Sequence, residues 1–159
     1  MPMGEIRIVE YQPQYATEVE DFINECMYVF SKRAYKKRKD VSNIREYYVE
    51  KGGNFWIALD ERNRIVGTIA LENRGNAGIM KRFYVAEDCQ AKGIGRQLYE
   101  VFERFAREET EIATLYLACG RVLEKAHRFY LRSGWEQTEM LEVEMQVAPE
   151  DDFFRKKIR

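Results

Sequence analysis

The sequence predicts a mixed α/β (α+β) fold, a single domain over residues 1–159 built on one central sheet. Three observations support this prediction. Some stretches have apolar residues at every second position, which is typical of strands. They alternate along the chain with stretches whose apolar residues recur every three to four positions, which is typical of helices. Antiparallel hairpins come first in this order, and a β-α-β crossover follows them. A chain of 159 residues is also long enough for one buried core and short for two.

The first half of the chain is expected to form a strand, two helices and a three-stranded meander. Residues 6–11 (IRIVEY) have the composition of a strand, and Pro13 then opens a helix with one apolar face. After the basic stretch 31–39 (SKRAYKKRK), Ser42 is expected to cap a second, short helix. The strands of the meander are expected at Phe55–Asp60, Arg64–Glu72 and Ile79–Val85, joined by the turns ERN and NRGNAG.

The second half is expected to alternate helices and strands before a final pair of strands. A helix with one apolar stripe runs from about Ile94 to Glu109, and Thr114–Cys119 has the pattern of a buried strand. The next helix, in VLEKAHRFYLR, ends before Gly134, which is expected to adopt a left-handed conformation. The closing strands are expected in WEQTEML and DDFFRKKI. The complete order is therefore β-α-α-β-β-β-α-β-α-β-β.

Composition and charge argue against several classes of protein. The formal net charge of −1 gives no overall attraction to nucleic acid, and no apolar run approaches the roughly 20 residues of a membrane span. The N-terminus has no apolar signal segment, so a mature cytoplasmic protein is expected. Cys26, Cys89 and Cys119 are scattered, and His127 is the single histidine. Neither a disulfide framework nor a metal site is expected, and Cys89 and Cys119 are interpreted as packing residues.

A glycine-containing turn precedes the helix at 94–109, in DCQAKGIGRQLYE. The first turn of a helix has unpaired N–H groups and a positive dipole end, both of which attract anions. Gly93 and Gly95 let the backbone approach a ligand closely, and Lys92 and Arg96 add positive charge. The turn therefore predicts a phosphate or pyrophosphate site, against the alternative of a helix start with two incidental glycines. It is not a P-loop, and the dinucleotide fingerprint fails because Leu98 stands where glycine is needed.

Three stretches carry motifs in a consistent order. The hairpin FWIALDERNRIVGTIALE comes first. IMKRFYVAEDCQAKGIGRQLYEVFERFA follows, with Gln90, Gly93 and Gly95 in a [QR]-x-x-G-x-[GA] turn. TLYLACGRVLEKAHRFYLRSGWE is the third, and its helix ends in the pattern A-x-x-F-Y-x-x-x-G-[FW]. Together they resemble the GCN5-related N-acetyltransferase (GNAT) superfamily over residues 54–135.

The resemblance implies a splayed, mostly antiparallel sheet. The strands at 79–85 and 114–119 would be neighbours that separate, with acetyl-coenzyme A (acetyl-CoA) in the gap between them. Family members often have an asparagine that bonds the pantetheine three residues before the helix alanine, and here that position is Leu123. The residues expected at the cofactor are Phe83, Tyr84 and Val85 along the pantetheine, and Gln90, Ala91, Lys92, Gly93, Ile94, Gly95 and Arg96 around the pyrophosphate.

Two side chains are candidates for proton transfer. The resemblance places Tyr130 as the general acid for the leaving thiolate, and a phenol with a pKa near 10 suits a thiol with a pKa of about 8.5. The alternative is an aromatic ring that only packs its helix on the sheet. Glu72, at the end of a strand beside the cleft, is the candidate general base, directly or through a water; the alternative is an exposed turn carboxylate. His127 is expected to point away from the Phe129 and Tyr130 face, either on the surface or behind the site, and not to act as the base.

The resemblance predicts an acetyl-CoA-dependent N-acetyltransferase in which an amine attacks the thioester directly. The expected partner is a small-molecule or peptide amine, with no nucleic acid and no membrane, and a homodimer is left open. Six Lys and Arg residues from Lys32 to Lys39 form either a solvated surface or an attraction for an acidic substrate. Two other functions stay open: an acyl-CoA sensor without turnover, and an RNA-binding domain that uses the same basic stretch.

Overall fold

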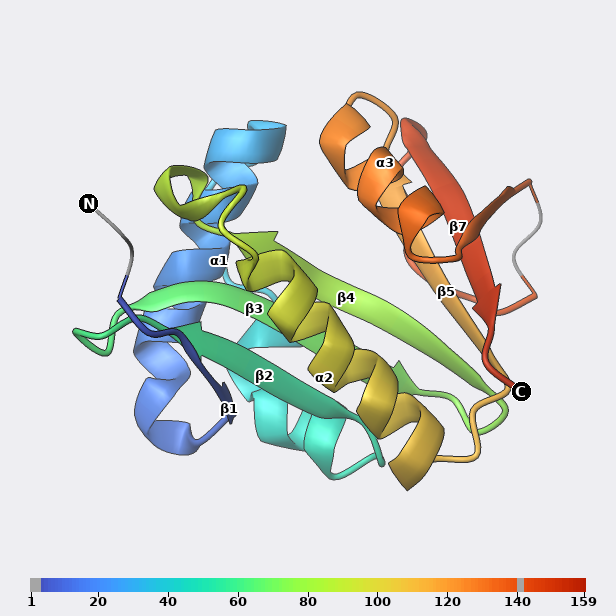
Figure 1. Cartoon of the computed structure of the whole chain (residues 1–159), viewed down its shortest axis with the longest axis horizontal. Coiled ribbons are helices and arrows are strands. Elements are labelled where there is room, and N and C mark those ends of the chain that lie inside the picture. The colour runs from blue at the N-terminus through green and yellow to red at the C-terminus, as the bar shows by residue number, and fades with distance from the viewer. Residues whose placement is uncertain (1–3, 140–141) are drawn as a thin grey trace.

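The structure is a computed structural model that describes residues 4–139 and 142–159. These residues form one seven-stranded sheet in the order β1-β2-β3-β4-β5-β7-β6 (Figure 1). Within the sheet β4 and β5 run parallel and all other neighbours run antiparallel. The strands are β1 (Arg7–Glu10), β2 (Asn54–Leu59), β3 (Ile65–Asn73), β4 (Ala77–Val85), β5 (Thr114–Gly120), β6 (Glu136–Thr138) and β7 (Asp151–Lys157). The mixed, mostly antiparallel fold class is confirmed.

Three α-helices are present in the described residues, on the two faces of the sheet. The chain also has 3-10 turns η1 (Pro13–Tyr15), η2 (Val41–Asn43) and η4 (Glu87–Cys89), and a π-helical segment η3 (Arg45–Val49). Helix α1 and the segments η2 and η3 cover one face, while α2 and α3 lie on the other (Figure 1). The helices are α1 (Ala16–Ser31), α2 (Ile94–Glu109) and α3 (Glu124–Arg132).

Each face of the sheet has its own apolar core. On the α1 face, buried residues of α1, η2 and η3 pack on β2 and β3, around Ile23, Tyr48 and Phe55. On the α2 face, α2 packs across β2, β3 and β4 through side chains that include Leu98 and Phe102, both with no exposed area. The strong amphipathic period of α2 is the reason that its bounds match the predicted ones, because one stripe of the helix must face the sheet.

The sheet divides between β4 and β5. These two strands pair at only three positions, where residues 77–79 of β4 face residues 114–116 of β5. Beyond this point β4 stays paired with β3 and β5 stays paired with β7 as far as Gly120, so the two strands diverge (Figure 1). The expected splayed pair of strands is therefore present, and the edge of β4 beyond Ile79 has no neighbouring strand on the β5 side.

A β-bulge lies in β4 immediately beyond the last pair with β5. Ala70 of β3 faces Lys81, and Thr68 faces Tyr84, so the one residue of β3 between these pairs lies opposite two residues of β4, Arg82 and Phe83. Arg82, inside the bulge, has a φ of 53°, which is unfavourable for a residue with a Cβ. The hydroxyl of Thr68 donates a 2.7 Å hydrogen bond to the Arg82 carbonyl oxygen. The carbonyl group of the bulge residue therefore has a hydrogen-bond partner on the neighbouring strand.

The short helix predicted after Ser42 differs from the observed segments. Residues 41–49 form a 3-10 turn followed by a π-helical turn, in which the N–H of Glu50 donates to the carbonyl oxygen of Arg45. Ser42 caps neither of them, because its hydroxyl donates a 2.6 Å hydrogen bond to Glu20 of α1. The tertiary contact with α1 thus replaces the local capping bond that the sequence suggests.

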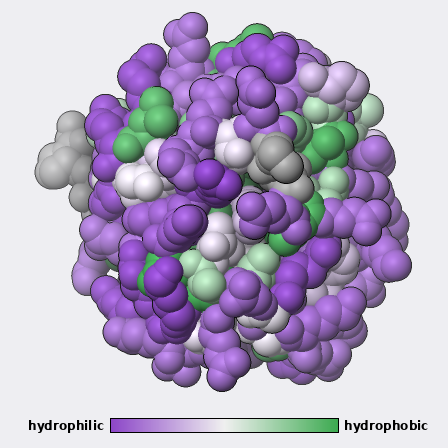
Figure 2. All heavy atoms as spheres, turned by 90° about the vertical axis from the view of Figure 1, so that its right-hand side faces the viewer, coloured by the Kyte–Doolittle hydropathy of each residue, from purple (hydrophilic) through white to green (hydrophobic). Residues whose placement is uncertain are grey.

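The side of the molecule that carries β7 and the end of α3 is mainly hydrophilic, and its hydrophobic residues form small separate patches (Figure 2). Within the described residues no helix combines the length and the apolar character needed to cross a bilayer. The predicted closing strand in WEQTEML is observed only as the short β6, and residues 140–141 of that stretch lie outside the described part of the chain.

Candidate active site

The turn between β4 and α2 presents a row of unpaired backbone N–H groups. Gln97 donates to Gly93 and is the first residue of α2 with a helical hydrogen bond. Among the described residues, none of the N–H groups of residues 93–96 has a hydrogen-bond acceptor. Unpaired N–H groups at the start of a helix attract anions. The turn therefore has the backbone arrangement that the predicted phosphate site requires.

Two residues of this turn have a left-handed backbone. Ala91 has a φ of 62° and Gly93 a φ of 83°, a pattern in which successive N–H groups point toward one side of the chain. A Cβ added to Gly93 would meet no atom within 4 Å, so the space beside the turn is empty. The nearest atoms to a Cβ at Gly95 are the Phe83 ring at 3.6 Å and the Val85 side chain at 3.7 Å. The two glycines keep this space free of side chains beside the end of β4.

The other residues expected at the cofactor are placed in different ways. Lys92 is exposed and can contact a bound anion, whereas Ile94 is buried in the core and contributes only its backbone. The amide of Gln90 donates a 3.2 Å hydrogen bond to the Val85 carbonyl oxygen, which ties the turn to the strand. Arg96 points away from the turn: its guanidinium lies 4.7 Å from the Phe129 ring centroid and donates to the Ser133 hydroxyl at 3.1 Å. Arg96 thus connects α2 to the end of α3.

Tyr130 of α3 lies in an aromatic cluster facing the divergent strands. Its side chain is 7% exposed, and its ring centroid lies 6.4 Å from Phe83, 5.6 Å from Phe154 and 6.1 Å from Trp135. Burial, followed by the neighbouring Cys119, raises the pKa of Tyr130 well above its ordinary value. The phenol therefore keeps its proton throughout the neutral pH range.

The hydroxyl of Tyr130 has no partner. None of the hydrogen bonds between described residues involves it, and no fully buried side-chain oxygen in that part of the chain lacks a partner. Since every fully buried side-chain oxygen in that part of the chain has a partner and this hydroxyl has none, the hydroxyl is not fully buried. It therefore borders open space. A nearly buried ring with a free, protonated hydroxyl is what a hydrogen-bond donor to a bound group requires. Packing alone would be served equally well by phenylalanine.

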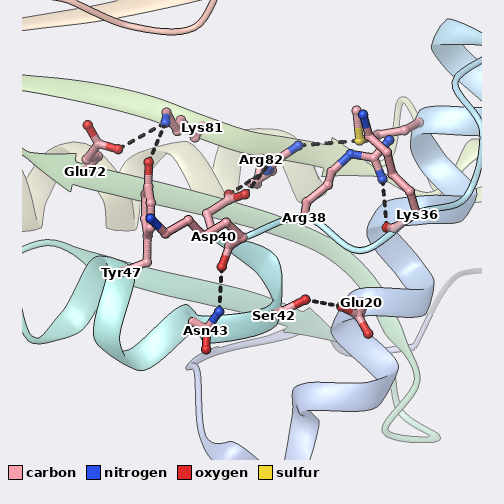
Figure 3. Close-up of polar contacts among 12 residues, drawn as sticks. Glu20, Lys36, Arg38, Asp40, Ser42, Asn43, Tyr47, Glu72, Lys81 and Arg82 are labelled. Atoms are coloured by element: carbon pink, nitrogen blue, oxygen red, sulfur yellow. Dashed lines mark hydrogen bonds and ion pairs between the residues drawn. The ribbon is translucent and has the colours of Figure 1, made fainter.

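Glu72 is a buried carboxylate, which excludes the alternative of an exposed turn residue. It is 5% exposed and lies on the α1 face at the end of β3. One oxygen accepts a 3.0 Å hydrogen bond from Lys81 (Figure 3), and the other pairs with Arg74. Burial acts to raise the pKa of Glu72, but Lys81, Tyr47 and Arg74 outweigh it and the pKa is lowered. Glu72 is therefore ionised at neutral pH and is a weak base.

A second buried carboxylate, Asp40, holds the side chain of the bulge residue. Arg82 donates to it through two nitrogen atoms, at 2.9 and 2.8 Å (Figure 3), and the Tyr48 hydroxyl donates at 2.6 Å. Burial acts to raise the pKa of Asp40, yet Arg82 and Tyr48 together lower it. The sequence analysis missed this group. The available signal was Arg82 itself, a charged residue inside a predicted strand, because a buried charge needs a partner.

The structure places two residues of the α3 region that the sequence singled out. His127 is half-buried and its ring packs against Phe154 at 5.1 Å, with Nε2 3.1 Å from the Gly120 carbonyl oxygen. Phe154 also contacts Tyr130, so of the two positions expected for His127 the structure has the one behind the site and not the one on the open surface. The hydrogen bond to the end of β5 turns the ring inward. Leu123 is the N-cap residue of α3 and provides no side-chain cap, and its side chain packs on the core of the α2 face.

The basic stretch is irregular and only partly solvated. Arg33 pairs with Glu150 at 3.2 Å, and both side chains are largely exposed. Arg38 is half-buried instead, and Nη1 donates a 2.5 Å hydrogen bond to the carboxamide oxygen of Asn24. Cys89 and Cys119 are both buried, and burial raises the pKa of Cys119 to about 12, so these thiols are poor nucleophiles.

Comparisons with known proteins agree with this geometry. A model of the acetyltransferase (GNAT) family matches residues 16–135. The chain is 27% identical over 108 residues to an N-acetylaspartate synthetase from Xenopus tropicalis, covering 66% of this chain and 39% of that protein. The chain thus spans about two fifths of the length of this curated relative. Its fold is similar to a crystal structure of an acetyltransferase from Streptococcus agalactiae 2603, with a TM-score of 0.87, 27% identity, and coverage of 96% of this chain and 98% of that one.

A further similar structure contains a ligand. It is the PaiA N-acetyltransferase from Thermoplasma acidophilum, solved in complex with coenzyme A, with a TM-score of 0.77 and 17% identity. The match covers 96% of this chain and 99% of that one. At this identity the likeness concerns the fold.

Proposed function

Because the chain belongs to the GNAT family of acetyltransferases, we propose that it transfers the acetyl group of acetyl-CoA to a primary amine by direct attack in a ternary complex. The single observation that carries the proposal is the divergence of β4 and β5 beside the turn of unpaired N–H groups. A free strand edge suits the amide groups of pantetheine, and the turn suits a pyrophosphate. The coenzyme A complex of the Thermoplasma acidophilum protein, which has the same fold, supports this assignment.

The proposed mechanism assigns a role to each element of the site. The thioester supplies an electrophilic carbonyl carbon and a thiolate leaving group. Backbone N–H groups near Val85 stabilise the negative charge that develops on the carbonyl oxygen. As the C–S bond breaks, the Tyr130 hydroxyl donates its proton to the sulfur, and the proton lost from the attacking nitrogen restores the phenol. Burial raises the pKa of Tyr130 and so makes the phenol a weaker acid, and it also disfavours a free thiolate. The proton from the attacking nitrogen therefore has to restore the phenol as the sulfur is protonated.

Glu72 is the proposed acceptor of the proton that the ammonium group of the substrate must lose before attack. Since its pKa is lowered, Glu72 stays ionised over the working pH range, and kcat/KM should rise with pH until the amine itself is deprotonated. Glu72→Gln should lower kcat/KM at neutral pH by about tenfold or more. The matched control is Glu103→Gln, because Glu103 is a half-buried carboxylate that likewise has a lysine partner but lies on the opposite side of the sheet. Equal rates for Glu72→Gln and the wild type at pH 7 would contradict the assignment.

The glycine turn gives a second prediction. Gly93→Asp should place a carboxylate in the space proposed for the pyrophosphate and weaken coenzyme A binding at least tenfold, about 1.4 kcal/mol. Isothermal titration calorimetry measures this affinity directly. Gly75→Asp is the matched control: Gly75 has a φ of 87° and the same empty surroundings, but lies in the turn between β3 and β4. Both variants have the same backbone strain, so a loss of affinity in both would contradict the phosphate role of the turn.

An acyl-CoA sensor without turnover is the alternative function. Leu123 favours it, because a leucine cannot provide the pantetheine hydrogen bond that asparagine provides in many family members. Release of free thiol from acetyl-CoA, measured across a panel of amines, separates the two functions. Acceptor-dependent thiol release supports the transferase, and binding of acetyl-CoA without release for every amine supports the sensor.

A further inference from the structure

A half-buried arginine without a carboxylate partner among the described residues, Arg38, lies on the α1 face near β4. Arg38 and Arg82 lie near one another (Figure 3), close enough to repel, and both interact with Tyr84 of β4. Arg82 is neutralised by its two bonds to Asp40. Arg38 forms no ion pair with a carboxylate among the described residues.

Arg38 is held in place by neutral groups only. It donates to the carboxamide of Asn24 at 2.5 Å, to the carbonyl oxygen of Lys36 at 3.4 Å and to that of Ala34 at 3.3 Å. Asn24 is 7% exposed, and its oxygen also accepts the backbone N–H of Lys36. These bonds use Nη1 and Nη2, and Nε has no acceptor in the described part of the chain. A half-buried guanidinium is thus positioned but not neutralised.

Burial, followed by repulsion from Arg82, lowers the pKa of Arg38. The charged form of Arg38 is therefore less stable here than in water. An anionic ligand would stabilise it. A guanidinium recognises a planar carboxylate with two parallel hydrogen bonds, which a surface lysine cannot form.

The charge lies near the proposed reaction centre. Arg38 lies two residues before Asp40, whose carboxylate binds Arg82 of the β4 bulge on the α1 face. The next residue of β4, Phe83, contacts Tyr130 on the other face of the strand, with 6.4 Å between the ring centroids. A group bound to Arg38 is therefore close to the point where the amine must meet the thioester. A short molecule that has both an amine and a carboxylate satisfies the two requirements together.

We infer that the acceptor is an amine that carries a carboxylate, such as an α-amino acid, and that Arg38 binds this carboxylate. The inference rests on the proposed acetyl transfer and specifies its substrate class. Binding by Arg38 leaves the amine free to approach β4 at the bulge. Amines without an anionic group, such as polyamines and aminoglycosides, would gain no bond from Arg38 and would be repelled by its charge.

The test compares matched acceptors that differ only in the carboxylate. Initial rates of thiol release are measured with the full chain, acetyl-CoA, and aspartate, glutamate, alanine and phenylalanine, each beside its C-terminal amide, and with spermidine. The free acids should have kcat/KM values at least tenfold above those of their amides. Arg38→Gln should raise KM for the best acid at least tenfold, with kcat within about twofold, and should leave the amides unchanged.

Two further variants make the result specific. Arg38→Lys keeps the charge and supports the same fold, so its KM should lie between those of the wild type and Arg38→Gln. Arg33→Gln is the matched control, because Arg33 belongs to the same stretch but already pairs with Glu150; its kinetics should equal those of the wild type. Equal use of acids and amides, or a preference for spermidine, overturns the inference and leaves the acetyl transfer intact. No thermal shift with acetyl-CoA and no thiol release with any amine overturn both.

Discussion

Tyr130→Phe is expected to lower kcat by about 100-fold or more, the usual scale for the loss of a general acid. The substitution removes one oxygen and keeps the ring, so the contacts with Phe83, Trp135 and Phe154 are retained and stability should change little. Affinity for acetyl-CoA should stay within about twofold, because a neutral thioester sulfur is a poor acceptor. The loss should appear equally in kcat and kcat/KM, since the hydrogen bond forms chiefly as the thiolate leaves.

Tyr99→Phe is the matched control for this experiment. Tyr99 is also a buried tyrosine of the α2 face, but its hydroxyl is occupied: it donates to Glu103 at 2.6 Å and accepts from Trp135 at 2.8 Å. Tyr99→Phe should therefore reduce stability by about 1 kcal/mol and leave kcat unchanged. Wild-type turnover by Tyr130→Phe with a good acceptor would show that Tyr130 only packs against its neighbours, and the thiolate would then leave without its help.

Asp40→Asn is expected to destabilise the fold by about 3–5 kcal/mol, the range for removing one partner of a buried ion pair. Arg82 would keep its charge in a site where its side chain is 17% exposed, with no carboxylate to replace Asp40. For a chain of this length the loss corresponds to a fall in Tm on the order of 10 °C. Urea unfolding followed by circular dichroism measures the free energy directly.

Glu136→Gln is the control, because it removes an ion pair of similar length that is exposed and not buried. Its ion pair with Arg155 is 2.7 Å long, but the Glu136 side chain is 61% exposed, so the loss should stay below about 1 kcal/mol. Similar losses in both variants would contradict the claim that burial makes the Asp40 pair important.

The pH dependence of stability adds a second readout. Because folding lowers the pKa of Asp40, its stabilisation is complete at neutral pH and is lost as the pH falls below about 4. Asp40→Asn should have a correspondingly weaker loss of stability in acid.

The elements that the sequence predicts well are those with a strong local pattern. Helix α2 has both an apolar stripe and a glycine at its N-cap, and its predicted and observed bounds agree. Gly134 has the predicted left-handed conformation, with a φ of 90°. The segment after Ser42 could not be predicted in the same way, because a hydrogen bond to α1 decides its conformation and no local pattern records that bond.

The residues of the candidate site also differ in whether a local sequence pattern predicts their position. The unpaired N–H groups of the turn follow from a glycine motif that is contiguous in the sequence, so they could be anticipated. The pair of Asp40 and Arg82 joins residues 42 positions apart, and no periodic pattern in the sequence around either residue indicates the contact. The free hydroxyl of Tyr130 and the two ion pairs of Glu72 likewise depend on which side chains surround them, and only the packed structure determines these surroundings.

The bulge in β4 decides which face of the sheet each later side chain of this strand reaches. Before the bulge, the even-numbered Met80 faces α2, while Lys81 faces α1. After it, the odd-numbered Phe83 and Val85 face α2, and Tyr84 faces α1. If the same residues formed a regular strand without the bulge, every side chain after Lys81 would turn to the opposite face. The bulge is therefore the reason that Phe83 lies beside Tyr130, and a substitution that straightened the strand would separate the two rings even though both residues remained in the chain.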